Sequence, residues 1–344
     1  MLIYYLGDNF VSKSGKAKLL LASTLFLLSS LAWGLDDETQ AAKEEGMRLY
    51  NISHSTAALP YLEKAANAGD VESMYYMGEA ERRQRMMNMT RAALEWYLKA
   101  AEHDDPYAML RLWGGGACVA GDECPEDAEG WREKALDEQL PLAEEGDAEA
   151  MLALYYIYGA LDDSDEGNEW LEKAAEAGNP EAQDRLAKMI RDGYGFYWSD
   201  ESRLEAAEKL ARQAAEQGHV PAMRTLSSML EEQGEEEESW EWEVKASDAG
   251  LLDARFGVAW CYLNPDSLQE FGGEQCRVKK DPVKGWAILY AMREEAGDHY
   301  PKNLMERNRD LLTYDQRQEA EALAEDEWLN HGPPLSNFPP KYGF

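Results

Sequence analysis

The pattern of apolar and polar positions is clearest between Trp170 and Ala187, where it predicts two helices joined by a tight turn. An aromatic residue opens the first helix, two alanines follow one turn later, and Gly178 ends it. The second helix begins at once and carries Ala182 and Leu186. Glycine readily adopts the left-handed conformation that ends many helices, and small side chains let neighbouring helices approach closely. The segment therefore predicts an antiparallel helix pair.

The same spacing recurs along most of the chain, which indicates a repeat array. Alanine recurs four residues before the turn, alanine or serine four residues after it, and a larger apolar residue eight residues after it. A fixed period of this length is typical of solenoids, in which each repeat buries its apolar face on its neighbours. We predict an all-α fold of stacked antiparallel helix pairs. The predicted turn residues are Gly69, Asp104, Gly146, Gly178, Gly218, Gly250 and Gly297.

The repeated phrase, aromatic-x-x-Lys-Ala-Ala-x-x-Gly and then Ala-x-x-x-Leu-small, resembles the SEL-like repeat (SLR), a relative of the tetratricopeptide repeat. Gly78, Ala187 and Ala259 match the small position of that family, and Tyr158 and Tyr262 match its later aromatic. The resemblance covers about residues 41–305. It implies a right-handed α-solenoid of about seven helix pairs over residues 35–304 and a protein-binding scaffold, without naming a partner.

The two ends of the chain depart from this pattern. Residues 1–34 contain three lysines, an apolar run from Leu19 to Leu28 and a small-residue site before Leu35, which is the order of a secretory signal peptide. The apolar run is short for a membrane span, and an uncleaved N-terminal anchor is the alternative. We predict a periplasmic or secreted protein without a membrane span after cleavage. Residues 305–330 are predicted to form a capping helix, and residues 331–344, with four prolines, an extended tail.

The chain is strongly acidic, with 67 Asp and Glu against 34 Lys and Arg and a formal net charge of −33. This charge opposes binding to nucleic acid or to an anionic membrane surface. It favours a partner with a basic face or a cationic substrate. The alternative interpretation is that the acidic surface only keeps the array soluble.

Four cysteines suit an exported chain. In an oxidising compartment the local pairing Cys118–Cys124 and Cys261–Cys276 is favoured among the three that are possible. Zinc binding is disfavoured because there is no CxxC motif and the two pairs lie several repeats apart. We predict no metal and no cofactor.

The sequence contains none of the motifs that commonly mark an active site. It has no HExxH, GxSxG, Walker or dinucleotide-binding motif, and its five histidines are scattered. Carboxylates are so frequent that no acid–base pair stands out. We therefore predict a protein that is not an enzyme, with a hydrolase as the third hypothesis.

The family resemblance implies that the first helix of each pair lines a concave face. Positions three, six and ten after the turn share one side of that helix and combine acids with aromatics, a composition that suits a protein interface. The alternative is that some of these aromatics pack against the next repeat. The predicted partner-binding residues are Glu72, Tyr75, Glu79, Tyr107, Glu149, Tyr156, Asp253, Phe256 and Trp260.

Two binding functions follow from these features. Exported acidic SLR proteins are similar to periplasmic immunity proteins that neutralise phospholipase effectors of type VI secretion, and an acidic groove would attract the basic face of such a toxin. The alternative is a secreted or envelope scaffold that binds host or cell-wall components. That alternative predicts regularly repeated disulfides, whereas this chain has at most two.

Overall fold

The computed structural model describes residues 35–113, 117–118, 128, 130–264, 276, 278–297 and 301–340. All of them belong to one unit, Leu35–Phe344. The predicted signal peptide, residues 1–34, lies outside the described residues, as does Cys124. Within the described residues, no helix has the length and apolarity that crossing a membrane requires.

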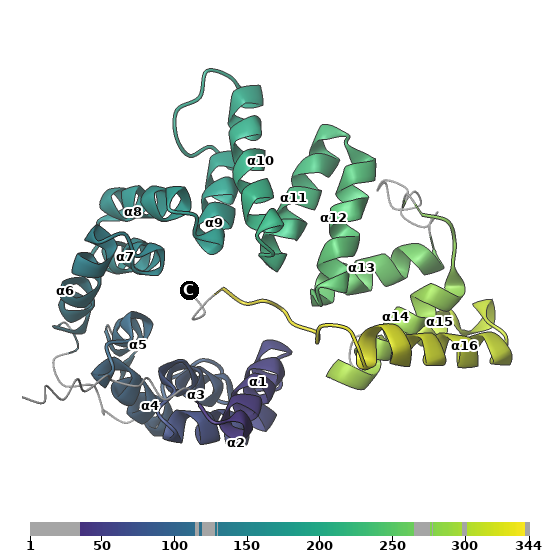
Figure 1. The fold of residues 1–344 in the computed structure, drawn as a ribbon, viewed down its shortest axis with the longest axis horizontal. Coiled ribbons are helices and arrows are strands. Elements are labelled where there is room, and N and C mark those ends of the chain that lie inside the picture. Colours follow the sequence, from purple (N-terminus) through teal and green to yellow (C-terminus); the bar gives the residue numbers. More distant parts are fainter. Residues whose placement is uncertain are drawn as a thin grey trace, which may run out of the picture. The chain divides into compact units, whose positions relative to one another are not determined.

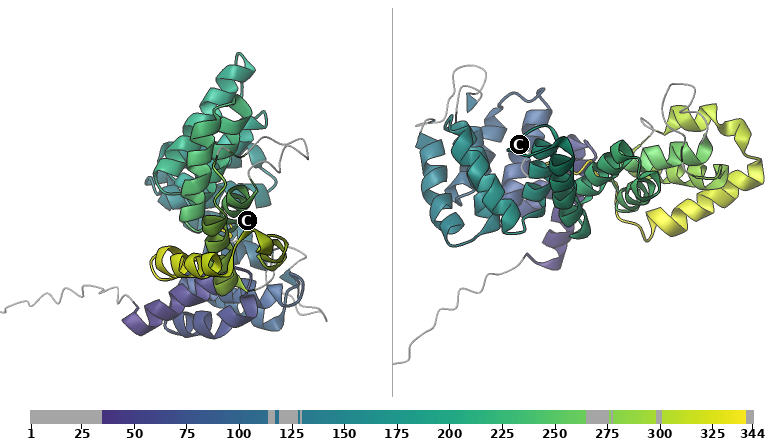
Figure 2. Two further views of the ribbon diagram at one scale, coloured as in Figure 1. Left: turned by 90° about the vertical axis from the view of Figure 1, so that its right-hand side faces the viewer. Right: turned by 90° about the horizontal axis from the view of Figure 1, so that it is seen from above.

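The described residues form helices that pack in chain order, each against the next (Figures 1 and 2). They contain no β-strand beyond one isolated bridge, so the predicted all-α fold of stacked antiparallel helix pairs is confirmed. The first helices of the pairs are α1 (Asp37–Asn51), α3 (Val71–Arg83), α5 (Pro106–Leu112), α7 (Ala148–Ala160), α9 (Pro180–Arg191), α11 (Val220–Gln233) and α13 (Leu252–Leu263). The second helices are α2 (Ser55–Asn67), α4 (Arg91–Glu102), α6 (Gly130–Glu144), α8 (Ser164–Glu176), α10 (Asp200–Glu216), α12 (Glu236–Asp248) and α14 (Pro282–Ala296).

The turns between pairs have the backbone conformation that the sequence predicted. Every predicted turn residue has a positive φ, from 61° at Asp104 to 101° at Gly146. In four pairs the next residue is an Asp or Asn whose side chain accepts a first-turn N–H, so the following helix starts without a break. At α11 and α13 the cap residues are His219 and Leu251, and neither makes a side-chain cap bond.

The recurring small residues lie at the helix contacts. The alanines four residues before the turn are fully buried, and the small residues four residues after it are at most 3% exposed. Three tryptophans, each eight residues before a turn, carry a lysine over the ring face in a cation–π contact. These pairs are Trp96 with Lys99, Trp170 with Lys173 and Trp242 with Lys245, each 3.7 or 3.8 Å from nitrogen to ring centre.

The predicted capping helix over residues 305–330 is divided into several helical segments. These are α15 (Lys302–Arg307), η3 (Arg309–Leu311), α16 (Tyr314–Ala324) and the π-turn η4 (Glu325–Leu329). Leu312 is extended, and Thr313 starts α16 by a capping box in which Thr313 and Gln316 exchange side-chain to backbone bonds. The apolar pattern continues through this restart, which is why the pattern alone predicted one helix.

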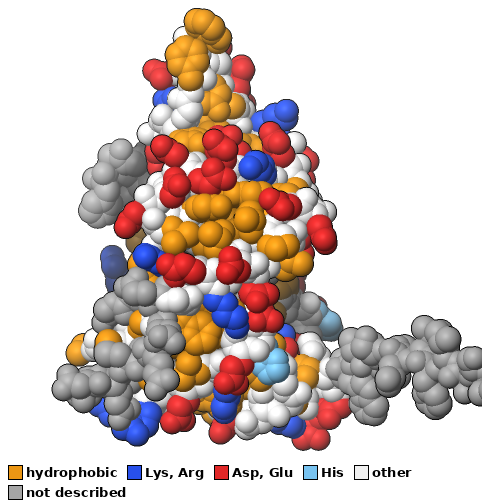
Figure 3. Space-filling view, turned by 90° about the vertical axis from the view of Figure 1, so that its left-hand side faces the viewer, with side chains coloured by type: hydrophobic (Ala, Val, Ile, Leu, Met, Phe, Trp, Pro, Cys, Tyr) orange, Lys and Arg blue, Asp and Glu red, His pale blue; other side chains and the backbone are white. Residues whose placement is uncertain are grey.

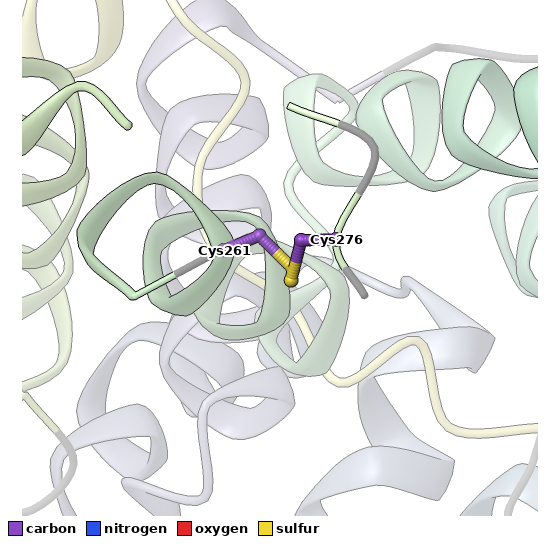
Figure 4. The surroundings of a disulfide bond; sticks show 2 residues. All are labelled: Cys261 and Cys276. Atoms are coloured by element: carbon purple, nitrogen blue, oxygen red, sulfur yellow. A yellow bond between two sulfur atoms is a disulfide. The ribbon is translucent and has the colours of Figure 1, made fainter. Parts of the chain in front are cut away.

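The predicted disulfide between Cys261 and Cys276 is confirmed (Figure 4). It ties the end of α13 to the segment before α14 and closes a loop with a sequence separation of 15. Cys118 is also disulfide-bonded. Its predicted partner, Cys124, lies outside the described residues.

Acidic side chains are spread over the surface. On the face shown in Figure 3, the side on which α6 and α8 lie in Figure 1, a patch of hydrophobic side chains is surrounded by acidic and a few basic ones. The segment between α9 and α10 adds two exposed aromatics, Phe196 and Trp198, with rings 5.4 Å apart. The negative charge is therefore not confined to one groove.

Candidate functional site

The largest candidate site is a groove of about 960 Å³ along the first helices of the pairs, which we call the tail groove. Among the described residues, its helical wall comes from α1, α3, α7, α9 and α11, each the first helix of its pair. Phe338, Pro339 and Pro340 of the C-terminal tail form another part of its wall. The groove is lined by Met47, Asn51, Glu72, Tyr76, Tyr155, Glu181, Asp184, Arg185, Lys188, Met189, Asp192, Tyr194, Gly218, His219, Val220, Pro221, Phe338, Pro339 and Pro340.

The charges of the tail groove are mixed. Four carboxylates share the wall with two bases and one histidine. Glu72 pairs with Lys43 at 2.7 Å, and Asp192 pairs with Arg191 at 3.0 Å. The sequence predicted a face of acids and aromatics, and here both of these carboxylates have cationic neighbours. The groove therefore offers alternating charges and three tyrosines to a polypeptide, rather than a uniform negative field.

One side of the groove is built around Asp184 of α9, which is 4% exposed. Its carboxylate lies 2.6 Å from Lys188 Nζ and 3.9 Å from His219 Nε2. Burial lowers the pKa of His219, Asp184 raises it and Lys188 lowers it, and the net shift is downward. Beside them the Arg185 guanidinium lies 5.1 Å from the centre of the Tyr156 ring. These fixed contacts hold the side chains of α9 in place without a ligand.

A second, smaller cavity of about 390 Å³ lies between α11, α12 and α13, and we call it the α11–α13 pocket. The predicted residues Phe256 and Trp260 line it with Trp240 and Glu243, and the Cys261–Cys276 disulfide forms part of its wall. Burial raises the pKa of Glu243, Arg224 opposes this shift, and the net shift is upward. The pocket therefore combines aromatic rings with a partly desolvated acid.

The predicted partner-binding residues do not form one surface. Glu72 lines the tail groove, and Phe256 and Trp260 line the α11–α13 pocket. Glu149 and Asp253 are exposed, and Glu149 accepts a hydrogen bond of 3.1 Å from the Asn179 side chain.

The other predicted positions lie inside the array. Tyr75, Glu79 and Tyr107 are at most 4% exposed, so their side chains are not on a binding surface in this structure. Tyr107 packs edge-on against Tyr156, with ring centres 5.7 Å apart and Tyr156 only partly exposed. Their placement corresponds to the alternative interpretation, packing between repeats.

The structure also brings in residues that the sequence did not single out. Arg185 and His219 enter the tail groove, and so do Phe338 and two prolines of the tail. The available signal was the pair of apolar residues, Leu335 and Phe338, in an otherwise proline-rich end. Among the described residues, no group of three or more His, Cys, Asp or Glu side chains is placed to hold a metal ion.

Comparison with known proteins gives similarities to solved structures only. No protein-family model and no curated protein matches this chain. A protective antigen of uropathogenic Escherichia coli that displays an SLR fold is 21% identical, over 86% of this chain and 73% of that one, with a TM-score of 0.36. A Sel1 repeat protein from Oxalobacter formigenes is 20% identical, over 78% of this chain and 97% of that one, with a TM-score of 0.37. Similarities at this level say nothing about what this chain binds.

Proposed function

We propose that this protein is an exported, non-catalytic scaffold that binds another protein in the tail groove. The observation that carries the proposal is that polypeptide in a non-helical conformation already packs along the groove, because Phe338, Pro339 and Pro340 of the chain's own tail form part of its wall. Paired charges and tyrosines along the wall suit a polar protein segment better than an apolar small molecule.

Export is supported by the cysteine chemistry. Disulfides persist in oxidising compartments and are rare where thiols are kept reduced. The Cys261–Cys276 bond, together with the signal-like order of residues 1–34, favours a periplasmic or secreted location.

The finer form of the proposal is a periplasmic immunity protein that neutralises a lipase or phospholipase effector of type VI secretion. A net charge of −33 would speed encounter with a basic toxin face, and the contacts in the groove would then slow its release. A matching effector should bind tightly, with an association rate that falls as salt is raised.

The test uses charge reversals in the full chain. Glu72→Lys and Asp192→Lys change the tail groove, whereas Glu145→Lys changes an exposed acid that lines neither cavity. Each groove variant should weaken effector binding by about 10-fold in calorimetry, and the control should stay within about 2-fold. Equal effects at all three positions would place binding outside the groove. If co-expression of this protein leaves the toxicity of the effector unchanged, the proposed immunity function is wrong.

A further inference from the structure

The C-terminal tail is bound as an extended segment against the turn between α12 and α13. The Ser336 N–H donates to the Gly250 carbonyl at 2.9 Å, and the Ser336 carbonyl accepts from the Leu252 N–H at 3.0 Å. These bonds form a parallel bridge between Ser336 and Leu251. In the yellow end of the ribbon the tail leaves the last helices and runs to the point marked C (Figure 1). The tail thus pairs through its backbone, as a peptide added to a strand edge does.

A buried ion pair holds the next part of the tail backbone. Arg255 is fully buried, and its guanidinium donates to the Glu295 carboxylate and to the Pro333 carbonyl, both at 3.3 Å. The other oxygen of Glu295 accepts the Leu335 N–H at 2.6 Å. The pair therefore contacts one carbonyl and one N–H, two groups that an extended segment of almost any sequence would present.

Two side chains of the tail supply apolar anchors with a spacing of three residues. Leu335 is 1% exposed and belongs to the main core cluster. Phe338 packs against a small separate cluster of Val220, Ala246, Leu251 and Ala254. Residues 333, 334 and 337 between and beside the anchors are exposed. The site therefore selects an aliphatic and an aromatic side chain and tolerates variation at positions 333, 334 and 337.

The receiving turn differs from the others in a way that leaves room for this segment. The α13 cap is Leu251, which has no side-chain oxygen, and a first-turn N–H of α13 is paired with the tail. A Cβ on Gly250 would lie 2.4 Å from the Pro334 carbonyl oxygen, whereas a Cβ on Gly178 would meet nothing within 4 Å. Both glycines have similar positive φ values, 94° and 93°. Gly250 is thus needed for the approach of the tail as well as for the turn.

We propose that this is a peptide-binding site and that the tail is its tethered ligand. A partner would insert an extended segment with an aliphatic residue and an aromatic residue three positions later, and this segment would replace residues 333–338. The proposal rests on the proposed function, because it names the kind of segment that a protein partner would contribute. Its test needs no natural partner, so it can fail while protein binding in the tail groove stands.

The experiment first releases the tail from the site by mutation and then adds the tail sequence as a separate peptide. In the full chain, Leu335→Asp with Phe338→Asp removes both anchors. A fluorescein-labelled peptide with the sequence of residues 331–340 is then titrated and followed by anisotropy. The double variant should bind it. For a peptide Kd on the order of 10 µM, a tethered tail at roughly 1 mM effective concentration should make wild-type binding about 100-fold weaker.

The matched glycine pair then locates the binding. Adding Gly250→Ala to the double variant should weaken peptide binding at least about 10-fold, because the new Cβ blocks the backbone. Adding Gly178→Ala, which imposes the same turn strain at a turn that lines neither cavity, should change it less than about 2-fold. A peptide with both anchors changed to Asp should not bind. Absence of binding to a folded double variant, or equal loss from both glycine changes, would overturn the proposal.

A second measurement covers the case in which the double variant does not fold. Amide hydrogen exchange at Ser336 is compared in the otherwise wild-type Gly250→Ala and Gly178→Ala chains. Exchange should quicken only in the Gly250 variant, with the helical circular dichroism signal unchanged. Slow exchange at Ser336 in both variants would mean that the tail does not leave the site and would overturn the proposal.

Discussion

Two buried ion pairs, one in the early repeats and one in the late repeats, are completed in different ways. Glu79 of α3 is 1% exposed, and one of its oxygens accepts from Tyr97 at 2.7 Å, Arg111 at 2.7 Å and Arg82 at 3.2 Å. All of these partners are side chains of helices, Arg82 on α3 itself and Tyr97 and Arg111 on the neighbouring α4 and α5. The Arg255–Glu295 pair instead uses part of its bonding capacity on the backbone of the tail.

The difference teaches how to separate a structural ion pair from one that contributes to a binding site. Charges taken from water must be compensated by near partners, or the fold loses several kcal/mol. At Glu79 the compensation comes from helices that cannot leave without unfolding. At Arg255 and Glu295 part of it comes from a segment at the end of the chain, which can be exchanged for a similar one.

The largest expected effect is loss of the Glu79 carboxylate. Glu79→Ala leaves Arg82 and Arg111 near each other without their shared acid, and the free energy of unfolding should fall by about 3–5 kcal/mol. Urea unfolding measures it. The exposed Glu102→Ala in α4 is the control and should change stability by less than about 0.5 kcal/mol. Amide exchange at Ser336 should be unchanged in the native state of Glu79→Ala. Faster exchange at Ser336 in this variant would contradict the conclusion that only the Arg255–Glu295 pair holds the tail.

A smaller loss of stability is expected at the other pair. Arg255→Met keeps the apolar stem and removes the charge, and Glu295 can regain water once the tail leaves. We expect a loss of about 2–3 kcal/mol in urea unfolding, together with faster exchange at Ser336. The control is Arg224→Met, whose guanidinium is half exposed and lies 3.5 Å from Glu243, and it should cost less than about 1 kcal/mol. Slow amide exchange at Ser336 in Arg255→Met would show that the Arg255–Glu295 pair does not hold the tail.

The smallest effect is a pH dependence. Burial raises the pKa of Glu295, the Leu335 N–H and Arg255 lower it, and the net shift is upward. The folded chain therefore holds this proton more tightly than the unfolded chain. The stabilisation is complete below the unfolded-state pKa of about 4.3 and is lost as the pH rises through the folded-state pKa.

This sign can be measured with Glu295→Gln. The unfolding free energy of the wild type minus that of the variant should decrease from pH 4 to pH 7. A Glu295 difference that is flat, or that grows with pH, would contradict the upward shift.

Much of the fold could be predicted because its determinants are local. A positive φ, a small residue at a helix crossing and an apolar residue two turns later are each requirements of one helix pair, so they repeat in the sequence. Asp104 illustrates this, since it takes the turn position in place of glycine and has the same left-handed conformation.

The binding face was harder to predict because burial in the array is not one-sided. Residues Ser73 to Ala80 of α3 are buried consecutively, so the middle of this helix has no exposed face. The periodicity of polar and apolar residues predicts one solvent-exposed face for each helix. On that assumption Tyr75 and Glu79 were expected at the surface. On α13 the positions predicted in the same way are accessible, because Asp253 is exposed and Phe256 is partly exposed.

The docking of the tail could not be read from spacing at all. Its partners are far away in the sequence, and Asn337 contacts Asn51 across 286 positions. Prolines predicted an extended end, but which turn would receive it depends on how all the repeats between are stacked.

The contact with Asn51 also bears on the mechanics of the array. Asn337 donates its backbone N–H and its side-chain amide to the Asn51 carbonyl, at 3.1 and 2.8 Å, while Ser336 is fixed at Leu251. An array whose repeats contact only their neighbours can flex, because no contact links repeats that are far apart in the sequence. The tail supplies such a contact, since it joins the turn before α13 to the end of α1. A partner segment that displaced the tail would also break its contact with Asn51 of α1. Binding of the partner would therefore make the array easier to bend.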